Sequence, residues 1–420
     1  MYASLLCVLR VIEEVEAVST TMDRVFVLDA HAKHGLVAIR SLGNRGFAVT
    51  AGSSIRWNAG KTSKYVSRRV TYPKPAEKPG EFVRSIQQEL QDHDYGMILP
   101  VDQKTVEVVV RHKSQLEEHT NVPFLPYDQL KVGLDKEATI KAARKYDIPH
   151  PKSRLSDEID LDSIESTLGG YPVVVKPRRG SGGKGVSVCD SHEELVRVYR
   201  RTLRQHGPVI LQEFIPNGGE RGVYTMYDRS STLSGITVQH RLRSRPPGGG
   251  ASTFRETISD PELVAISDRL LSSLEWQGVA MAEYRYDRRD GEPKLMEINP
   301  RLWGSLALSV FAGVDFPYQL YRFATDEPLE QDLTYDVGVQ ARSLFHDWLQ
   351  AMERENRLVA MREFFTPSSK PCCYDIVSKD DPLPILGQIG YWLSLYKDSK
   401  TDGDGIEPVV VSEATDEDQA

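Results

Sequence analysis

Two acidic residues and one amide lie close together in residues 283–301, which read EYRYDRRDGEPKLMEINPR. An Asp-Gly turn signal at residue 290 predicts two antiparallel strands that fold back there. Because side chains alternate along a strand, a turn centred on residue 290 places Glu283 opposite Glu297, with Asn299 on the same face as Glu297. The sequence therefore predicts two opposed carboxylates with an amide oxygen beside them.

Opposed carboxylates across a strand ladder repel, so Glu283 and Glu297 need a cation between them. Two carboxylates and an amide oxygen form an all-oxygen site, which suits magnesium that shares its shell with phosphate oxygens better than it suits zinc. A solvated hairpin with ordinary surface charges explains these residues equally well. The rest of the chain must decide between the two interpretations.

A glycine-rich loop follows a predicted buried strand at residues 171–176, which read YPVVVK. The loop, PRRGSGGKG at residues 177–185, combines four glycines with three cations. Its backbone N–H groups can wrap phosphate while the cations neutralise it. No Gly-Lys-Ser or Gly-Lys-Thr opens a helix, and the chain returns at once to a strand, VSV. We predict a hairpin lid over a nucleotide, with a plain flexible turn as the alternative.

Two further segments carry candidate binding groups. Residues 208–215, PVILQEFI, read as a strand whose end offers backbone groups to an adenine edge. Residues 241–253, RLRSRPPGGGAST, read as a second flexible loop that concentrates three arginines beside three glycines. That composition suits the clamping of an anionic substrate or an acyl phosphate, although a solvated loop is the alternative.

The first part of the chain predicts a parallel sheet with helices packed on it. From Val25, short apolar runs alternate with a helical segment as in a βαβ unit. The spaced glycines of a dinucleotide fingerprint are missing, which disfavours a nicotinamide cofactor. His31, Lys33 and His34 follow the first strand, where open α/β sheets place ligand crevices, but such loop residues are more often solvated.

Helix signals divide the chain further. Asp135 occupies an N-cap position ahead of a helical stretch at residues 137–146. Ser191 and Glu194 form a capping box for a helix that ends before Gly207. Helices are also predicted at residues 81–91 and 262–274, and an amphipathic one at residues 382–397.

Composition narrows the class of protein. A chain of 420 residues, 40% hydrophobic and 27% charged, suits a soluble globular protein of two or three domains. A net charge of -8 gives no support to a nucleic-acid partner. Four cysteines are too few and too badly spaced for a disulfide framework or a zinc knuckle, so we expect a cytoplasmic protein. No run of about 18 apolar residues predicts a spanning helix.

The order of these parts resembles the ATP-grasp superfamily, and within it the carbamoyl-phosphate-synthetase-like carboxylate–amine ligases. The motifs are Lys136 on its helix, VVVKP, GSGGKG, QEFI with a glutamate beyond, GGGAST and AEYRYD…LMEINPR, and they cover residues 24–327. The resemblance implies a fold of mixed α/β and α+β class. It consists of an N-terminal α/β domain followed by a two-lobed ATP-grasp domain with antiparallel sheets.

The resemblance also implies a role for each matching residue. Residues that match the phosphate-binding lysines and the mobile lid are Lys136, Lys176, Ser181, Gly182, Gly183 and Gly185. The adenine hinge and the ribose-binding position match Gln212, Glu213, Phe214, Ile215 and Glu220. The metal ligands match Glu283, Glu297 and Asn299. Arg301 matches a cation at the transferred phosphoryl group, and Arg241 and Arg243 are the predicted substrate clamp.

The implied activity is an ATP- and magnesium-dependent ligation, with manganese as the alternative ion. A small-molecule carboxylate is activated as an acyl phosphate, and an amine displaces the phosphate. The two substrates stay open, as does homo-oligomer formation. His240 beside Arg241 is a candidate base, with a solvated or buried histidine as the simpler alternative. A non-catalytic nucleotide-binding regulator and a kinase-like phosphotransferase are the rival functions.

The predicted organisation has five parts. Residues 1–22 are read as a flexible extension, with Met22 as an alternative start. Residues 23–125 form the N-terminal α/β domain and residues 126–328 the ATP-grasp domain. Residues 329–397 form a mixed C-terminal extension of open role, and residues 398–420 an acidic disordered tail.

Overall fold

The computed structural model describes residues 23–180, 182–246, 249–354 and 356–401. The predicted extension with Met22, Ser181 of the glycine-rich loop and residues 402–420 of the predicted tail lie outside these ranges. Within them, no helix combines the length and apolar character that crossing a membrane requires.

A parallel four-stranded sheet forms the N-terminal part, in the order β3-β2-β1-β4. Its strands are β1 (Arg24–Val27), β2 (Ala48–Ser53), β3 (Val66–Thr71) and β4 (Met97–Leu99). The surrounding helices are α2 (Lys33–Asn44), η2 (Gly60–Thr62), α3 (Pro79–Asp92), α4 (Gln103–Arg111), α5 (Lys113–Leu116) and α6 (Tyr127–Leu134). Val25, Phe26 and Val27 are all 0% exposed, because neighbouring elements cover both faces of the central strand. The predicted βαβ start is confirmed.

A smaller antiparallel sheet, in the order β5-β8-β6-β7, follows. Its strands are β5 (Ser153–Arg154), β6 (Val173–Pro177), β7 (Ser187–Cys189) and β8 (Val209–Glu213). Its helices are α7 (Lys136–Lys145), η3 (Leu161–Ser163), α8 (Ile164–Leu168) and α9 (His192–His206). Both predicted N-caps are confirmed, since Asp135 accepts from the N–H of Glu137 and Ser191 from that of Glu194.

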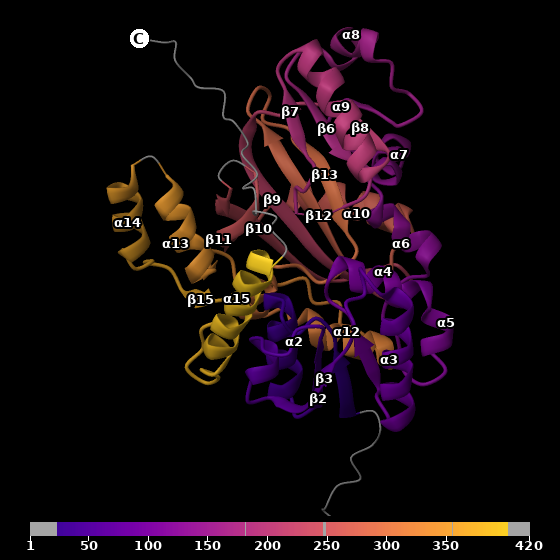
Figure 1. Cartoon of the computed structure of the whole chain (residues 1–420), viewed down its shortest axis with the longest axis vertical. Helices are drawn as coiled ribbons and strands as arrows, with labels where there is room; N and C mark the ends of the chain where they lie inside the picture. Colours follow the sequence, from indigo (N-terminus) through magenta and orange to yellow (C-terminus); the bar gives the residue numbers. More distant parts are fainter. Residues whose placement is uncertain (1–22, 181, 247–248, 355, 402–420) are drawn as a thin grey trace, which may run out of the picture.

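A seven-stranded sheet forms the centre of the molecule, in the order β13-β12-β9-β10-β11-β14-β15 (Figure 1). Its strands are β9 (Asn217–Tyr227), β10 (Leu233–Arg245), β11 (Ala251–Thr257), β12 (Gly278–Asp287), β13 (Pro293–Asn299), β14 (Gln340–Arg342) and β15 (Cys372–Tyr374). All neighbours pair antiparallel except β14 and β15. The predicted fold class, a parallel N-terminal sheet followed by two antiparallel lobes, is confirmed.

Six helices complete the described part of the chain after β11. They are α10 (Pro261–Ser273), α11 (Leu306–Phe311), α12 (Phe316–Ala324), α13 (Leu344–Glu353), α14 (Arg357–Phe365) and α15 (Pro384–Thr401). Figure 1 shows α13 and α14 at one side of the large sheet and α15 beside α2. Gly387 of α15 lies so close to the loop before η2 that an added Cβ would be 2.4 Å from the carbonyl oxygen of Asn58. The C-terminal helix thus packs on the N-terminal sheet's own helices.

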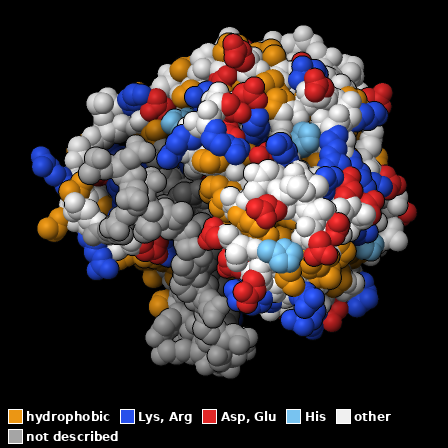
Figure 2. All heavy atoms as spheres, turned by 90° about the horizontal axis from the view of Figure 1, so that it is seen from above, with side chains coloured by type: hydrophobic (Ala, Val, Ile, Leu, Met, Phe, Trp, Pro, Cys, Tyr) orange, Lys and Arg blue, Asp and Glu red, His pale blue; other side chains and the backbone are white. Residues whose placement is uncertain are grey.

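Two predictions about segment boundaries are wrong. A strand was predicted to run to Arg243 and to lead into a flexible loop at residues 241–253, but β10 continues through Arg245 and pairs with β11 from Ala251 onward. The pairing of residues 241–245 with β11 outweighs the local loop signal of prolines and glycines. Helix α15 continues to Thr401, so it includes the first residues of the predicted tail. In the view of Figure 2, basic and acidic side chains are interspersed over the molecule, in keeping with the modest net charge.

Candidate active site

The predicted acidic hairpin is confirmed as a structure. Strands β12 and β13 pair antiparallel, and Glu283 lies directly opposite Glu297 in the register. Gly291 in the turn has φ 75°, a conformation that favours glycine, and this is the reason the Asp-Gly signal marks the fold-back point. Asn299 donates from Nδ2 to Oε1 of Glu297 at 2.8 Å. The three predicted metal ligands are therefore brought together at one end of the hairpin.

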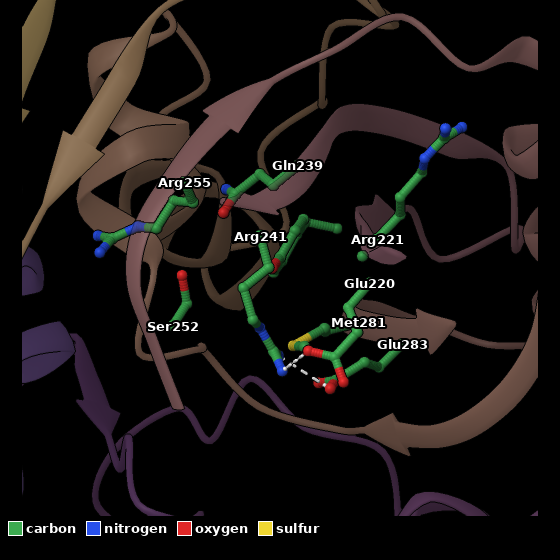
Figure 3. Close-up of a pocket in the computed structure, with 10 residues that line it drawn as sticks. Glu220, Arg221, Gln239, Arg241, Ser252, Arg255, Met281 and Glu283 are labelled. Carbon is green, nitrogen blue, oxygen red and sulfur yellow. Dashed lines mark hydrogen bonds and ion pairs between the residues drawn. The ribbon is translucent and has the colours of Figure 1, made fainter. Parts of the chain in front are cut away.

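Arg241 provides part of the positive charge that the acidic pair needs. Its Nη2 donates to Oε1 of Glu283 at 2.9 Å, and its Nη1 donates to Oε2 of Glu220 at 2.5 Å. Figure 3 shows the Arg241 side chain reaching toward both carboxylates. Burial raises the pKa of Glu283. Arg241 opposes this shift, whereas the neighbouring carboxylates Glu297 and Glu220 raise the pKa further. One guanidinium is shared between two carboxylates, so the group of acids still favours a further cation.

Lys176 on β6 faces the same acids. The Lys176 side chain is half-buried, and desolvation together with Arg285 and Lys136 lowers the pKa of its ammonium group to about 7, while Glu297 and Glu283 oppose the shift. Lys136, the first residue of α7, donates from Nζ to the carbonyl of Gly180 at 2.8 Å, so it lies against the glycine-rich loop. The two predicted phosphate-binding lysines thus lie near each other and near the acidic pair.

The glycine-rich loop joins β6 and β7 as the predicted hairpin. Gly180, Gly182, Gly183 and Gly185 all have positive φ, between 67° and 131°, which explains why glycine stands at each of these positions. At Gly185 an added Cβ would lie 2.7 Å from Cγ of Pro177, so the loop closes tightly at that end.

Arg301 follows the hairpin and points toward the same region. It donates from Nη1 to the carbonyl of Leu302 at 2.8 Å and from Nη2 to Oδ1 of Asn299 at 3.4 Å. Its buried Nε has no hydrogen-bond partner among the described residues. Burial lowers the pKa of Arg301, whereas Asp102, Glu297 and Glu283 oppose the shift. A buried guanidinium with a spare donor suits an anionic group of a ligand.

The predicted adenine hinge is held by backbone and side-chain contacts at the end of β8. Gln212 is buried and donates from Nε2 to Oγ of Ser153 at 2.8 Å. Glu213 accepts from the N–H of Lys152 at 2.7 Å. Phe214 and Ile215 follow directly. Glu220 lies elsewhere, on β9, where its carboxylate also accepts from Nη2 of Arg285 at 2.6 Å. Its predicted ribose contact stays a prediction.

The structure separates the two arginines of the predicted substrate clamp. Arg241 lines the pocket, but Arg243 makes two hydrogen bonds of 2.7 Å to the buried carboxylate of Asp347 on α13. Arg245 is likewise paired with Glu353. His240 alternates with Gln239 and Arg241 along β10, and both of these line the pocket, so His240 faces away from it. The simpler interpretation of His240 is favoured.

The three candidate residues after β1 are not merely solvated. His31 is bonded through Nδ1 to Oγ of Ser53 at 3.0 Å, and His34 through Nε2 to the carbonyl of Val101 at 3.0 Å. Burial and the neighbouring Arg301 lower the pKa of His34 to about 3, so the ring is neutral. Lys33 forms an ion pair with Asp375 at 3.0 Å.

Sequence reasoning missed most of the pocket that Arg241 and Glu283 line. The pocket lies between β9, β10, β11 and β12 (Figure 3), and the space within it that a water-sized sphere can occupy is only about 10 Å³. Its other lining residues are Glu220, Arg221, Gly222, Tyr224, Gln239, Ser252, Arg255 and Met281. Glu220 was predicted as a ribose contact and Ser252 lies in the predicted GGGAST loop, but no local motif marks the other lining residues. Only the strand register brings them together.

The donor set fits a magnesium ion bound together with a nucleotide. Across the described ranges, no cluster of three or more His, Cys, Asp and Glu residues has the arrangement of a protein-only metal site. Glu283, Glu297 and Asn299 supply two carboxylates and an amide, which leaves part of an octahedral shell to phosphate oxygens and water. Lys176, Lys136 and Arg301 surround the same region with positive charge.

Comparisons with known proteins agree with this arrangement. Residues 135–228 match the family model "Carbamoyl-phosphate synthase L chain, ATP binding domain". Residues 205–344 match "ATP-grasp in the biosynthetic pathway with Ter operon". The two matches overlap and together include β6, β8 and the acidic hairpin.

Individual proteins resemble this chain at low sequence identity. A D-aspartate ligase from Enterococcus faecium is 25% identical over 240 residues, which cover 53% of this chain and 56% of that protein. The chain thus spans little more than half the length of this relative. Biotin carboxylase from Campylobacter jejuni has a TM-score of 0.64 at 15% identity, over 77% of this chain and 75% of its own. L-amino acid ligase from Bacillus licheniformis has a TM-score of 0.57 at 19% identity, over 73% and 75%. At such identities the solved structures share the fold alone.

Proposed function

Since this chain is an ATP-grasp protein that resembles the carbamoyl-phosphate-synthetase-like carboxylate–amine ligases, we propose that it activates a carboxylate with ATP and joins it to an amine. The observation that carries the proposal is the pair Glu283 and Glu297, opposed on one hairpin with Lys176 and Arg301 beside it. This alternation of acids and cations is what a magnesium–triphosphate group requires.

In the proposed first step, an oxygen of the substrate carboxylate attacks the γ-phosphorus of ATP. The bond to the bridging oxygen breaks, and ADP leaves with that electron pair. Glu283, Glu297 and Asn299 would hold magnesium, which neutralises charge on the phosphate oxygens. Lys176, Lys136 and Arg301 would hold the phosphate oxygens in line, since positioning and charge neutralisation are the main contributions a protein makes to phosphoryl transfer.

In the proposed second step, the amine nitrogen attacks the acyl carbon of the acyl phosphate. The carbon–oxygen bond to phosphate breaks, phosphate leaves, and the nitrogen loses one proton to the departing phosphate or to water. The acyl phosphate must be shielded from hydrolysis between the two steps. The glycine-rich hairpin between β6 and β7 lies next to Lys136 and is the element suited to cover it.

An amino acid is the substrate class that the relatives favour. One relative is named D-aspartate ligase, and one similar structure is named L-amino acid ligase. The pocket beside Glu283 contains both cationic and anionic side chains, which suits a molecule that carries an ammonium and a carboxylate group. We therefore propose an amino acid as at least one of the two substrates. The homo-oligomer and the cytoplasmic location stay predictions.

The proposal is tested by trapping the activated acid. The protein is incubated with magnesium-ATP, hydroxylamine and a panel of carboxylates that includes L- and D-amino acids, and hydroxamate and ADP are measured. Hydroxamate formed together with ADP supports the ligase. A stable phosphorylated product identifies a kinase-like phosphotransferase instead, and nucleotide binding without turnover identifies a non-catalytic regulator.

A further inference from the structure

The two lysines that are proposed to hold phosphate come from two different elements. Lys176 lies on β6, and Lys136 is the first residue of α7. One nucleotide can contact both lysines only if α7 and β6 keep a fixed separation, because a displacement of about 1 Å is enough to weaken such contacts. The residues that join these two elements therefore affect the proposed phosphate site.

Arg178 joins the first turn of α7 to the end of β6 through its side chain. Its Nε donates to both carboxylate oxygens of Asp135, at 2.7 and 2.8 Å, and its Nη1 lies 3.3 Å from Oε2 of Glu137. Asp135 and Glu137 are 4% and 3% exposed, and they stand on either side of Lys136 in the chain. One guanidinium thus holds both sequence neighbours of Lys136.

The backbone of Arg178 makes the same connection. Its carbonyl accepts from the N–H of Lys136 at 3.0 Å, and its N–H donates to the carbonyl of Pro208 at 2.9 Å. Arg178 directly follows Pro177, the last residue of β6, and stands two residues after Lys176. The side-chain and backbone bonds together fix the start of α7 against the end of the strand that carries Lys176.

The glycine-rich loop begins beside this connection. Lys136 donates from Nζ to the carbonyl of Gly180, which is two residues after Arg178 and has φ 131°. Arg178 thus stands between the strand and the loop that is proposed to cover the acyl phosphate. Its Nε and Nη1 are both directed at buried acids, so an effect of Arg178 on bound phosphate acts through Lys136.

We propose that Arg178 is a positioning residue of the nucleotide site, which holds Lys136 at the separation from Lys176 that one polyphosphate group requires. This inference rests on the proposed function, in which both lysines hold phosphate. The composition of the loop predicted that its cations, Arg178 among them, neutralise phosphate directly. The contacts of Arg178 support an indirect role instead.

Arg144 offers a matched control at the opposite end of α7. It lies in the last turn, and its Nη1 and Nη2 donate to the carboxylate of Glu158 at 2.7 and 3.1 Å. The side chain of Arg144 is 36% exposed, close to the 33% of Arg178. Both arginines therefore tie α7 to a neighbouring segment through a carboxylate, but only Arg178 lies beside Lys136.

The test is a double-mutant cycle on the full chain. The non-hydrolysable imido analogue of ATP, with magnesium, is titrated by calorimetry into the wild type, Arg178→Met, Lys136→Met and the double variant. Adenosine, which carries no phosphate, is titrated into the same four forms. Arg144→Met is measured beside them, and urea unfolding of each form shows that the variant is folded.

Arg178→Met should lower the affinity for the ATP analogue by about tenfold, but by less than about twofold when Lys136 is already Met, because no lysine is then left to misplace. Adenosine affinity should stay within about twofold in all forms, and so should both affinities in Arg144→Met. Arg178→Lys keeps the charge but not the contact with both oxygens of Asp135. It should recover part of the affinity, and it replaces Arg178→Met in the cycle if that variant does not fold.

Five results would overturn the inference. These are unchanged affinity for the ATP analogue in both Arg178 variants, a loss that is equally large with and without Lys136, an equal loss for adenosine, an equal loss in Arg144→Met, and no binding of the analogue by the wild type.

The ligase can fail separately from this inference. If the cycle shows the expected coupling but no hydroxamate forms with any carboxylate, the role of Arg178 stands and the proposed reaction fails. If hydroxamate forms but the losses from Arg178→Met and Lys136→Met simply add, the reaction stands and the positioning role fails.

Discussion

Two pairs of like charges face each other across neighbouring strands of the same sheet. Glu283 on β12 lies opposite Glu297 on β13, and Arg241 on β10 lies opposite Arg255 on β11. Like charges placed directly opposite destabilise a strand ladder. The molecule neutralises the two pairs in different ways.

Each arginine has its own carboxylate. Arg241 is bonded to Glu220 and Glu283, and Arg255 is bonded to Asp375. Among the residues that the structure describes, the acidic pair has a share of Arg241 and the amide of Asn299 in hydrogen-bond contact. The basic pair is thus neutralised within the protein, whereas we propose that a bound cation completes the neutralisation of the acidic pair.

The largest expected effect comes from the acidic pair. Glu297→Ala should lower turnover by about 10²–10³-fold, because the metal loses a carboxylate, while the unliganded protein becomes no less stable because the repulsion with Glu283 disappears. Turnover and urea unfolding measure the two effects. Glu292→Ala, in the same hairpin turn with a side chain 60% exposed, is the control and should leave both unchanged. Near-full activity in Glu297→Ala would remove the metal site from the proposal.

The second prediction distinguishes the role of Arg241 from that of Arg243, which lies two residues further along β10. Arg241→Met should reduce turnover by about 10–10²-fold, because it removes a pocket cation and leaves Glu283 and Glu220 without it. Arg243→Met should act on stability instead, since Asp347 keeps Arg342 but loses two hydrogen bonds, at a cost of about 1–3 kcal/mol. Equal losses of turnover in the two variants would show that Arg243 binds the substrate together with Arg241, as the sequence predicted.

The third effect concerns the pH dependence of nucleotide binding. Burial lowers the pKa of Lys176 to about 7 in the free protein, and bound phosphate favours its charged form. ATP affinity should therefore be constant well below pH 7 and fall by up to about tenfold per pH unit above it, until the pKa of the bound state is reached. Lys176→Ala should bind ATP weakly at every pH, and Lys176→Arg should show a flat profile. A wild-type affinity that rises from pH 7 to pH 9 would contradict this role.

The smallest effect tests a purely local interaction. Ser191 caps α9 by accepting from the N–H of Glu194, and Ser191→Ala should cost about 1 kcal/mol of unfolding free energy. The substitution leaves the acidic and basic pairs untouched, so amino acid and MgADP affinities should not change. Calorimetric unfolding and the two titrations measure this. A change in MgADP affinity would show that the cap also sets the position of the glycine-rich hairpin.

The two pairs also differ in how far the sequence predicts them. The acidic pair lies within one hairpin, so the Asp-Gly turn predicts its position closely, and a register shift between Glu283 and Tyr284 completes the pairing of Glu283 with Glu297. The glycine-rich hairpin was predictable for the same reason, because the four glycines stand where the backbone needs positive φ. Local chemistry determines both structures.

The basic pair could not be predicted, because its partners are remote in sequence. Asp375 is 120 residues from Arg255 and 342 from Lys33. A strand was predicted to run to Arg243, ahead of a loop rich in proline and glycine, but only the pairing of β10 with β11 shows that Arg241 lies opposite Arg255. A residue whose role depends on sheet register carries no motif of its own.

The ion pair between Lys33 and Asp375 has a consequence for how the protein is made. A ribosome adds about 5–20 residues per second, so the 342 residues that separate the two partners take roughly 17–70 s to synthesise. Lys33 lacks its counter-ion throughout that time, and Arg255 lacks it while the last 120 of those residues are made, roughly 6–24 s. Arg255, which lines the pocket, therefore gains its buried counter-ion only after residue 375 has been synthesised.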